Sequence, residues 1–174
     1  AYDVVTALQR SRALARLNVD VFEQPTPARD TAALRRLRAA GHLPIAADES
    51  VFSSSDLLHL LHMEALDILV VKVSKLGGLW HARRCLDLTE EVGVPILGSG
   101  LTESGLGAAA SAALFGGYHL AGPADLNGPQ MLAPAAGVPP WRVQEGSLVL
   151  PTGHGIGVQP DVQQLPTNEA SDGH

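Results

Sequence analysis

Two acidic residues and one lysine that could bind a cation or move a proton lie at the ends of short apolar runs. Glu23 follows the run NVDVF, Asp48 follows LPIAA, and Lys72 lies near the end of DILVVKV. Successive positions are 25 and 24 residues apart, which leaves room for one helix between each pair. If the runs are adjacent parallel strands, about 4.8 Å apart, we expect these side chains to converge at one edge of a sheet.

Glu23 and Asp48 are candidate ligands for a hard divalent cation. Two carboxylates that face each other repel, which raises the pKa of one of them, and Mg²⁺ relieves that repulsion because it prefers oxygen ligands. Either acid could instead cap the helix that follows it, or pair with an arginine such as Arg29. The residues alone leave these alternatives open.

Lys72 is the candidate acid–base residue, because lysine is seldom found within an apolar strand. Burial lowers the pKa of a lysine and nearby carboxylates raise it, so its proton affinity can be tuned. The alternatives are a lysine on the outer face of the sheet, or an amine that forms a Schiff base as in an aldolase. Lys75 follows the strand and precedes a Gly-Gly turn, so we expect it on the outer face.

The glycine-rich turn GSGLTESGLG at 98–107 does not have the spacing of a nucleotide site. Glu103 stands where the third glycine of G-x-G-x-x-G would be needed. From its type and position alone, Glu103 is expected to be a solvated or capping acid of a loop. His59 and His62 lie three residues apart on an expected surface helix with no evident third ligand, so we expect them to be solvated.

An alternation of strands and helices is needed to bring these residues together. The expected strands are 18–22, 43–47, 67–73, 94–97 and, more weakly, 118–121; the expected helices are 3–16, 31–40 after an Asp30 cap, 53–62 with Ser53 as cap, 77–92 and 105–115. Near-continuous apolar strands joined by helices indicate a parallel sheet. Charged residues at the ends of successive strands favour a (β/α) barrel over a doubly wound sheet, which gathers its ligand at one switch point.

Composition excludes several classes of protein. The 174 residues are 45% hydrophobic and 17% charged, which is enough apolar material for a folded core. The net charge of −6 repels phosphate backbones, so no nucleic-acid partner is expected. The sequence has no apolar run long enough for a membrane helix, and its single cysteine, Cys85, excludes a disulfide framework. We expect a cytoplasmic protein with no membrane partner.

Four motifs together resemble the enolase superfamily. The segments VFEQPTP, PIAADESVF, VVKVSKLGG and PILGSGLTESGLGAAAS occur in the order and spacing of that superfamily, and they are most similar to the muconate cycloisomerase branch of the mandelate racemase and muconate-lactonizing enzymes. The resemblance covers about residues 1–163. It implies proton transfer next to a substrate carboxylate, through an enediolate stabilised by Mg²⁺ or Mn²⁺.

The same resemblance implies a role for each motif residue. It assigns Glu23 and Asp48 as metal ligands, Lys72 and Glu103 as catalytic residues, and Ser99, Asp125 and Asn127 as substrate contacts. It also implies a small carboxylate substrate and a complete enzyme that forms a homo-oligomer. A dipeptide epimerase and an o-succinylbenzoate synthase-like enzyme are the alternatives within the family, although Asn127 stands where such epimerases carry a second aspartate.

The expected fold is α/β, the C-terminal part of a (β/α)₇β TIM-like barrel. The family's N-terminal capping domain, its K-x-K lysines and its D-x-N metal ligand have no counterpart in the sequence. We expect residues 1–140 to form barrel strands 4 to 8, residues 141–163 to return toward a capping domain, and residues 164–174 to be a disordered tail. Alone, such a chain is expected to be inactive, and an inactive fragment or an aldolase that uses Lys72 is the alternative from another class.

Overall fold

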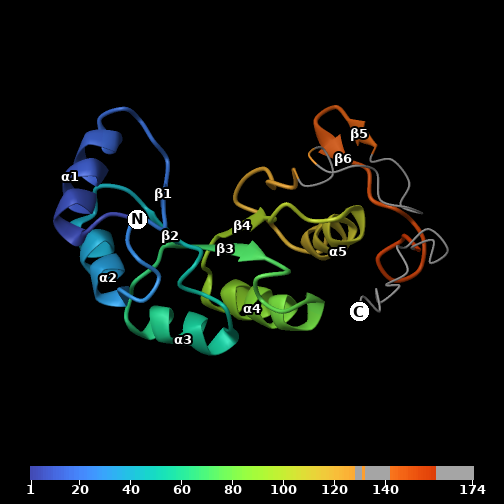
Figure 1. Ribbon diagram of the computed structural model, residues 1–174, viewed down its shortest axis with the longest axis horizontal. Helices are drawn as coiled ribbons and strands as arrows, with labels where there is room; N and C mark the ends of the chain where they lie inside the picture. The colour runs from blue at the N-terminus through green and yellow to red at the C-terminus, as the bar shows by residue number, and fades with distance from the viewer. Residues whose placement is uncertain (128–130, 132–141, 160–174) are drawn as a thin grey trace, which may run out of the picture.

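A parallel sheet with helices along one side forms the body of the protein (Figure 1). The computed structural model describes residues 1–127, 131 and 142–159. The elements in chain order are α1 (Val4–Ala15), β1 (Phe22–Glu23), α2 (Thr31–Ala40), β2 (Ile45–Ala47), α3 (Ser54–His62), β3 (Ile68–Lys72), α4 (Leu79–Val92), β4 (Ile96–Ser99), α5 (Gly105–Phe115), β5 (Val143–Gln144) and β6 (Ser147–Leu148). A helix follows each of the first four strands, as the alternation of apolar runs predicts.

The first four strands are parallel and lie in the order β1-β2-β3-β4. Within the described residues the strand order never reverses, whereas a doubly wound sheet reverses at its switch point. Helices follow one another along the outside of the sheet in chain order (Figure 1). This arrangement confirms the expected strand–helix series of a (β/α) barrel.

The two faces of the sheet differ in chemistry. Ile45, Ala47, Leu69, Val71 and Ile96 point toward the helices and join the hydrophobic core. Strand residues alternate between faces, so the register places the intervening residues on the other side. We call that side the carboxylate face; its residues are Glu23, Ala46, Asp48, Ile68, Val70, Lys72, Leu97 and Ser99.

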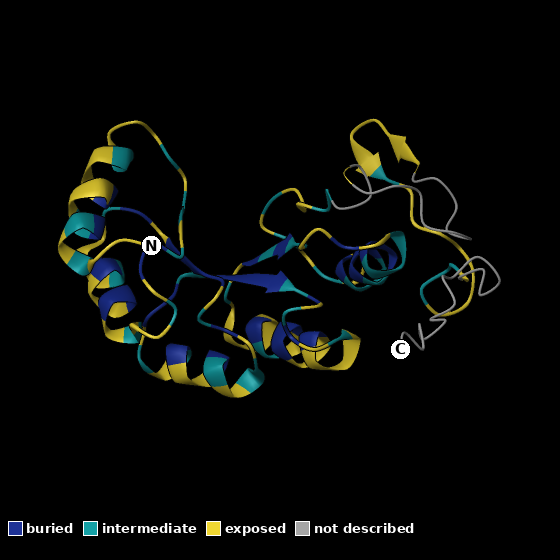
Figure 2. Cartoon of the chain, in the orientation of Figure 1, coloured by how far each residue is buried: buried dark blue, intermediate teal, exposed yellow. Residues whose placement is uncertain are grey.

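The core between sheet and helices is aliphatic, and the helices begin at the expected caps. Figure 2 shows buried residues along the strands and on the helix faces that meet them, with exposed residues on the outer faces. The side chain of Asp30 accepts a hydrogen bond from Ala33 N, and that of Ser53 accepts one from Asp56 N. Asp56 Oδ2 in turn accepts from Phe52 N and from Ser53 Oγ, so the start of α3 is closed by both side chains.

The structure corrects two of the predicted strands. The predicted strand 118–121 is absent, because Gly116 and Gly117 continue into a turn and Pro123 has no N–H for a ladder. Instead Ala121 N donates to Ile96 O and Asp125 forms an isolated parallel bridge with Ser99. The expected strand at 18–22 begins only at Phe22, since Asn18 has a left-handed φ of 56° in the turn after α1.

The C-terminal part forms a short antiparallel hairpin from β5 and β6. Its two-residue turn has left-handed φ values at Glu145 (50°) and Gly146 (77°), as tight hairpin turns require. The second strand of the hairpin, β6, ends at Leu148. The tail predicted to be disordered, 164–174, lies outside the described residues. No helix in the described ranges has the length and apolar character needed to cross a membrane.

Candidate active site

Asp48 is the centre of the candidate site, because both of its carboxylate oxygens are bound by lysines. It lies just after β2 and is 1% exposed. Lys72 Nζ, at the end of β3, is 2.5 Å from Asp48 Oδ2, and Lys75 Nζ is 2.7 Å from Oδ1. These are the only two lysines in the sequence, so all of the chain's lysine charge meets one buried carboxylate.

The charges in this cluster shift one another's pKa values. Burial alone would raise the pKa of Asp48, but hydrogen bonds from Lys72 and Lys75 and their charges outweigh it and lower that pKa. Burial alone would lower the pKa of Lys72, but its hydrogen bond to Asp48 and the charges of Asp48 and Glu23 raise it. The cluster therefore holds Asp48 as the anion and Lys72 as the cation.

Glu23 shares the carboxylate face with Asp48, from the end of the neighbouring strand. Its register partner is Ala46, two residues before Asp48, so both carboxylates point to the same side. Partial desolvation, followed by the negative charge of Asp48, raises the pKa of Glu23, although Lys72 opposes the shift. Neither acid caps a helix, because Asp30 and Ser53 do so, and Asp48 pairs with lysines rather than with Arg29.

The prediction that Lys75 lies on the outer face was wrong. Its side chain is 5% exposed, and Nζ donates to Asp48 O at 2.6 Å and to Val70 O at 3.2 Å besides the bond to Asp48 Oδ1. Leu76 N donates to Lys72 O, so the chain turns helically directly after β3. Residues three apart in a helical turn share a side, which is why Lys75 joins Lys72 instead of alternating away from it. Burial lowers the pKa of Lys75 despite the nearby charge of Asp48.

Glu103 is buried, which corrects the expectation of a solvated or capping loop acid. It is 9% exposed, and Ser104 rather than Glu103 caps α5. Glu103 Oε1 accepts from Ser74 Oγ at 2.6 Å, and Oε2 accepts from the buried Ser111 Oγ at 3.1 Å. Gly107 permits this approach, because a Cβ there would lie 3.3 Å from Glu103 Cβ. The two serines fix the carboxylate beside the loop that follows β3.

The residues expected to contact substrate lie at the end of β4 and beyond it. Ser99 is the register partner of Lys72, so it neighbours the lysine on the carboxylate face. Asp125 is exposed and is joined to this edge by its bridge with Ser99. Asn127 lies two residues further along the chain and is half-buried. The tertiary structure thus gathers Glu23, Asp48, Lys72 and Ser99 on one face and extends it toward Asp125.

Sequence reasoning missed Gln24, which joins the loops after β1 and β2. Its side-chain Oε1 accepts from Asp48 N at 2.9 Å and from Ser50 N at 3.1 Å. Its Nε2 donates to Ser50 Oγ at 2.8 Å and to Thr26 O at 3.1 Å. The only signal in the sequence was its position in the motif EQP, next to Glu23.

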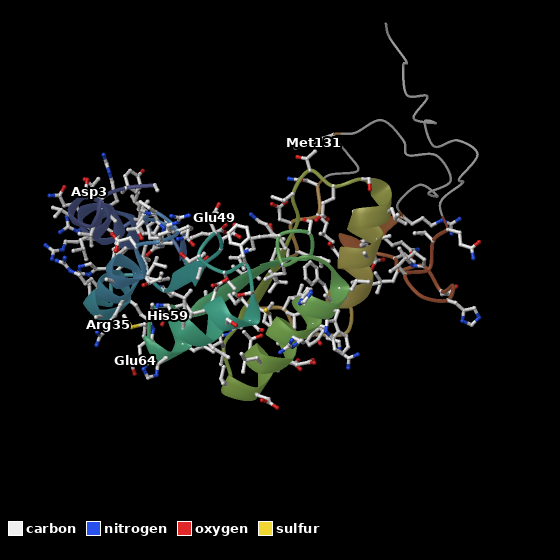
Figure 3. All side chains as sticks on the ribbon, turned by 60° about the horizontal axis from the view of Figure 1, so that its bottom comes forward. Asp3, Arg35, Glu49, His59, Glu64 and Met131 are labelled. Atoms are coloured by element: carbon white, nitrogen blue, oxygen red, sulfur yellow. The ribbon has the colours of Figure 1, made fainter. Side chains whose placement is uncertain are left out.

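The two carboxylates fit part of a site for a divalent cation. They offer oxygen donors only. Desolvation and, after it, the charge of Asp48 raise the pKa of Glu23, and a hard cation would relieve the repulsion between the two acids. In the described ranges no group of three or more His, Cys, Asp or Glu side chains is arranged to hold a metal. His59, labelled on α3 in Figure 3, and His62 are exposed, as predicted. Glu49, labelled beyond β2 in the same view, adds negative charge that also raises the pKa of Glu23.

Comparison of the sequence with known protein families identifies the family to which the chain belongs. Residues 1–165 match the family described as enolase C-terminal domain-like. The chain belongs to this family. This confirms the resemblance to the enolase superfamily drawn from the four motifs, and with it the expected TIM-barrel-like α/β fold.

Individual relatives point to several members of the superfamily. The chain is 41% identical to o-succinylbenzoate synthase of Thermobifida fusca (strain YX) over 114 residues, which cover 66% of this chain and 34% of that protein. It is 30% identical to muconate cycloisomerase 1 of Rhodococcus opacus over 169 residues, covering 95% of this chain and 45% of that protein. The crystal structure of 2-chloromuconate cycloisomerase from Rhodococcus opacus 1CP superposes with a TM-score of 0.86 at 33% identity, covering 93% and 44% of the two chains. The chain spans less than half the length of these family members.

Proposed function

We propose that this chain supplies part of the active site of a metal-dependent isomerase or lyase of the muconate cycloisomerase type. The reaction moves a proton at the carbon next to a carboxylate of a small substrate. The observation that carries the proposal is the pairing of Lys72 with Asp48 on a sheet face that also holds Glu23. Barrel enzymes place their active sites at the carboxyl ends of the parallel strands, and here an amine and two carboxylates lie at those ends.

Each residue has a role that its position supports. Glu23 and Asp48 would hold Mg²⁺ or Mn²⁺, and when bound the cation supplies positive charge that stabilises the enediolate form of the substrate carboxylate. Lys72 holds a proton at Nζ, 2.5 Å from Asp48, and delivers it to, or recovers it from, the substrate carbon. Ser99, Asp125 and Asn127 contact the substrate along the edge of β4. Glu103, fixed by Ser74 and Ser111, acts as a second catalytic acid.

The chain's two lysines make the mechanism testable. In the protein as its gene encodes it, Lys72→Met should lower the Mg²⁺-dependent conversion of muconate, followed by its ultraviolet absorbance, about 10²–10⁴-fold, the usual worth of a general acid or base. Arg36→Ala, on the exposed side of α2, is the matched loss of a positive charge and should leave the rate within about twofold. If Lys72→Met retained its activity, Lys72 would not be the residue that transfers the proton.

Borohydride trapping separates this mechanism from Schiff-base chemistry. An aldolase would leave a reduced substrate adduct on a lysine, and only Lys72 and Lys75 could carry it. Mass spectrometry should find neither modified. An adduct on Lys72, together with turnover that ignores chelation of divalent cations, would replace the proposal with the aldolase alternative.

An o-succinylbenzoate synthase is the second candidate. The 41% identity to that enzyme from Thermobifida fusca, over 66% of this chain, favours it specifically. Both candidates need the same lysine and carboxylates, so the residues described here do not distinguish them. Formation of o-succinylbenzoate, followed by chromatography, against consumption of muconate under the same conditions would decide between the two.

A further inference from the structure

Gln24 lies next to one candidate metal ligand and bonds the loop of the other, and it has an unusual backbone conformation. It has a φ of +33°, which a residue with a side chain rarely adopts. Gln24 directly follows Glu23, and its own N–H donates to Ala46 O at 2.9 Å, the last rung of the ladder from β1 to β2. Strained backbone of this kind persists only when the surroundings over-determine it.

The side-chain amide continues that ladder where the backbone of β1 turns away. Oε1 accepts from two donors of the loop after β2, Asp48 N and Ser50 N. On its other side, Nε2 donates to Thr26 O in the loop after β1 and to Ser50 Oγ, which in turn donates to Ala28 O. The four contacts of Gln24 therefore connect the loop that begins after Glu23 with the loop that begins at Asp48.

The partners fix which way the amide lies. Oε1 faces two N–H donors, and Nε2 faces a carbonyl acceptor, so a flipped amide would set its NH₂ group against Asp48 N and Ser50 N. Neither a carboxylate nor an apolar side chain reproduces this pattern. A glutamate would place an acceptor against Thr26 O, and a methionine would make none of the four bonds.

The consequence is that Asp48 is held at its backbone as well as at its side chain. Its N–H is bound by Gln24, its carbonyl by Lys75 Nζ and Val51 N, and its carboxylate by both lysines. The bond from Asp48 N to the residue after Glu23 links the backbone that carries one acid to the backbone that carries the other. A hard cation needs such a fixed donor geometry.

We propose that Gln24 is a positioning residue for the cation site, which holds Asp48 in register with Glu23. The inference rests on the proposed function, in which these two acids bind a divalent cation. Partners that orient metal ligands typically account for about 10–100-fold in metal affinity. All four hydrogen bonds of the Gln24 side chain go to protein groups around Asp48, so its effect should be seen in cation affinity.

The test compares Mn²⁺ binding, by calorimetric titration of the protein as its gene encodes it, with two variants. Gln24→Met keeps the length of the side chain and loses all four hydrogen bonds, and its Mn²⁺ affinity should fall about 10–100-fold. Asn18→Gly is the matched control, because Asn18 also has a left-handed φ but lies in an exposed turn away from the site. Its affinity should equal that of the unaltered protein.

A second readout does not depend on the metal. Amide hydrogen exchange at Asp48 and Ser50 should accelerate at least about tenfold in Gln24→Met and stay unchanged in Asn18→Gly, because only the former loses the acceptor for those N–H groups. Ser50→Ala, which removes one of the four contacts, covers the case in which Gln24→Met does not fold; its Mn²⁺ affinity should fall about two- to fivefold.

The outcomes separate this inference from the function on which it rests. Unaltered protein that binds no Mn²⁺ would remove both proposals. Mn²⁺ binding that is the same in Gln24→Met, or in Ser50→Ala if the former does not fold, would overturn only the positioning role. Protected Asp48 and Ser50 amides in Gln24→Met would overturn it as well.

Discussion

Replacing Lys75 by methionine should destabilise the protein more than the same change at Lys72, although both lysines bind Asp48. Lys75 is 5% exposed and donates to three acceptors, whereas Lys72 is 15% exposed and donates to one. Methionine matches the lysine side chain as far as Cε and keeps most of its volume, so the comparison isolates the ammonium group. The two variants are therefore matched controls for each other.

The magnitude follows from what each change leaves behind. Removing one partner of a buried ion pair costs about 3–5 kcal/mol, because the other charge stays buried and uncompensated. In Lys75→Met the remaining lysine still compensates part of the Asp48 charge, so we expect the lower end, about 3 kcal/mol. In Lys72→Met, Lys75 keeps both Asp48 Oδ1 and the Asp48 carbonyl bonded, and only one charge-assisted hydrogen bond is lost, so we expect a smaller cost of about 1.5–2 kcal/mol.

Urea unfolding followed by circular dichroism at pH 7 measures both differences. The midpoint should fall further in Lys75→Met with the slope unchanged, which identifies a loss of stability rather than a change in the unfolded state. Adding Asp48→Asn to each variant should recover part of the loss, because the uncompensated charge is then gone. Equal midpoints for Lys75→Met and Lys72→Met would refute the reasoning that burial and the number of acceptors decide the cost.

Two further predictions concern groups away from the lysines. Burial and the hydrogen bond to Asp87 raise the pKa of Tyr118 to about 12. The folded state therefore retains a proton that the unfolded state loses near pH 10. The resulting stabilisation is complete below about pH 10 and is lost as the pH rises through about 12. Absorbance titration should show Tyr118 ionising at about pH 12, and Asp87→Asn should bring its midpoint back toward pH 10; an unchanged midpoint would contradict the assigned cause. Ser111→Ala removes a hydrogen bond to the buried Glu103 carboxylate and should cost about 1.5–3 kcal/mol in urea unfolding, whereas unaltered stability would show that this hydroxyl does not hold Glu103.

Some predictions were wrong because they followed a local sequence rule, whereas a tertiary contact decided the position of the residue. The rule of strand alternation sent Lys75 to the outer face, but the helical turn after β3 returned it to Asp48. A glutamate in a glycine-rich loop is usually solvated, yet Ser74 and Ser111, which are 37 residues apart in sequence, enclose Glu103. The apolar run near 118–121 suggested a strand, but Pro123 and the double glycine before it leave only the bridge at Asp125.

The sequence by itself determined the regular features. Apolar runs at intervals of 24 and 25 residues specify parallel strands joined by helices, and Asp30 and Ser53 mark where two of those helices begin. Because side chains at the ends of parallel strands meet at one edge of a sheet, the candidate roles of Glu23, Asp48 and Lys72 could be assigned without coordinates. The four motifs identified the family for the same reason, because each of them lies at the end of a strand.

Only the tertiary structure decided how those residues are held. That Lys75 binds one oxygen of Asp48 and Lys72 the other depends on the path of the chain after β3. Gln24 reaches the loop of Asp48 because its backbone is left-handed. Its bonds to Asp48 and Ser50 span 24 and 26 positions of the sequence, respectively. Sequence patterns report the period of a strand or helix, whereas such bonds depend on where two loops meet in space, and no local period encodes that meeting.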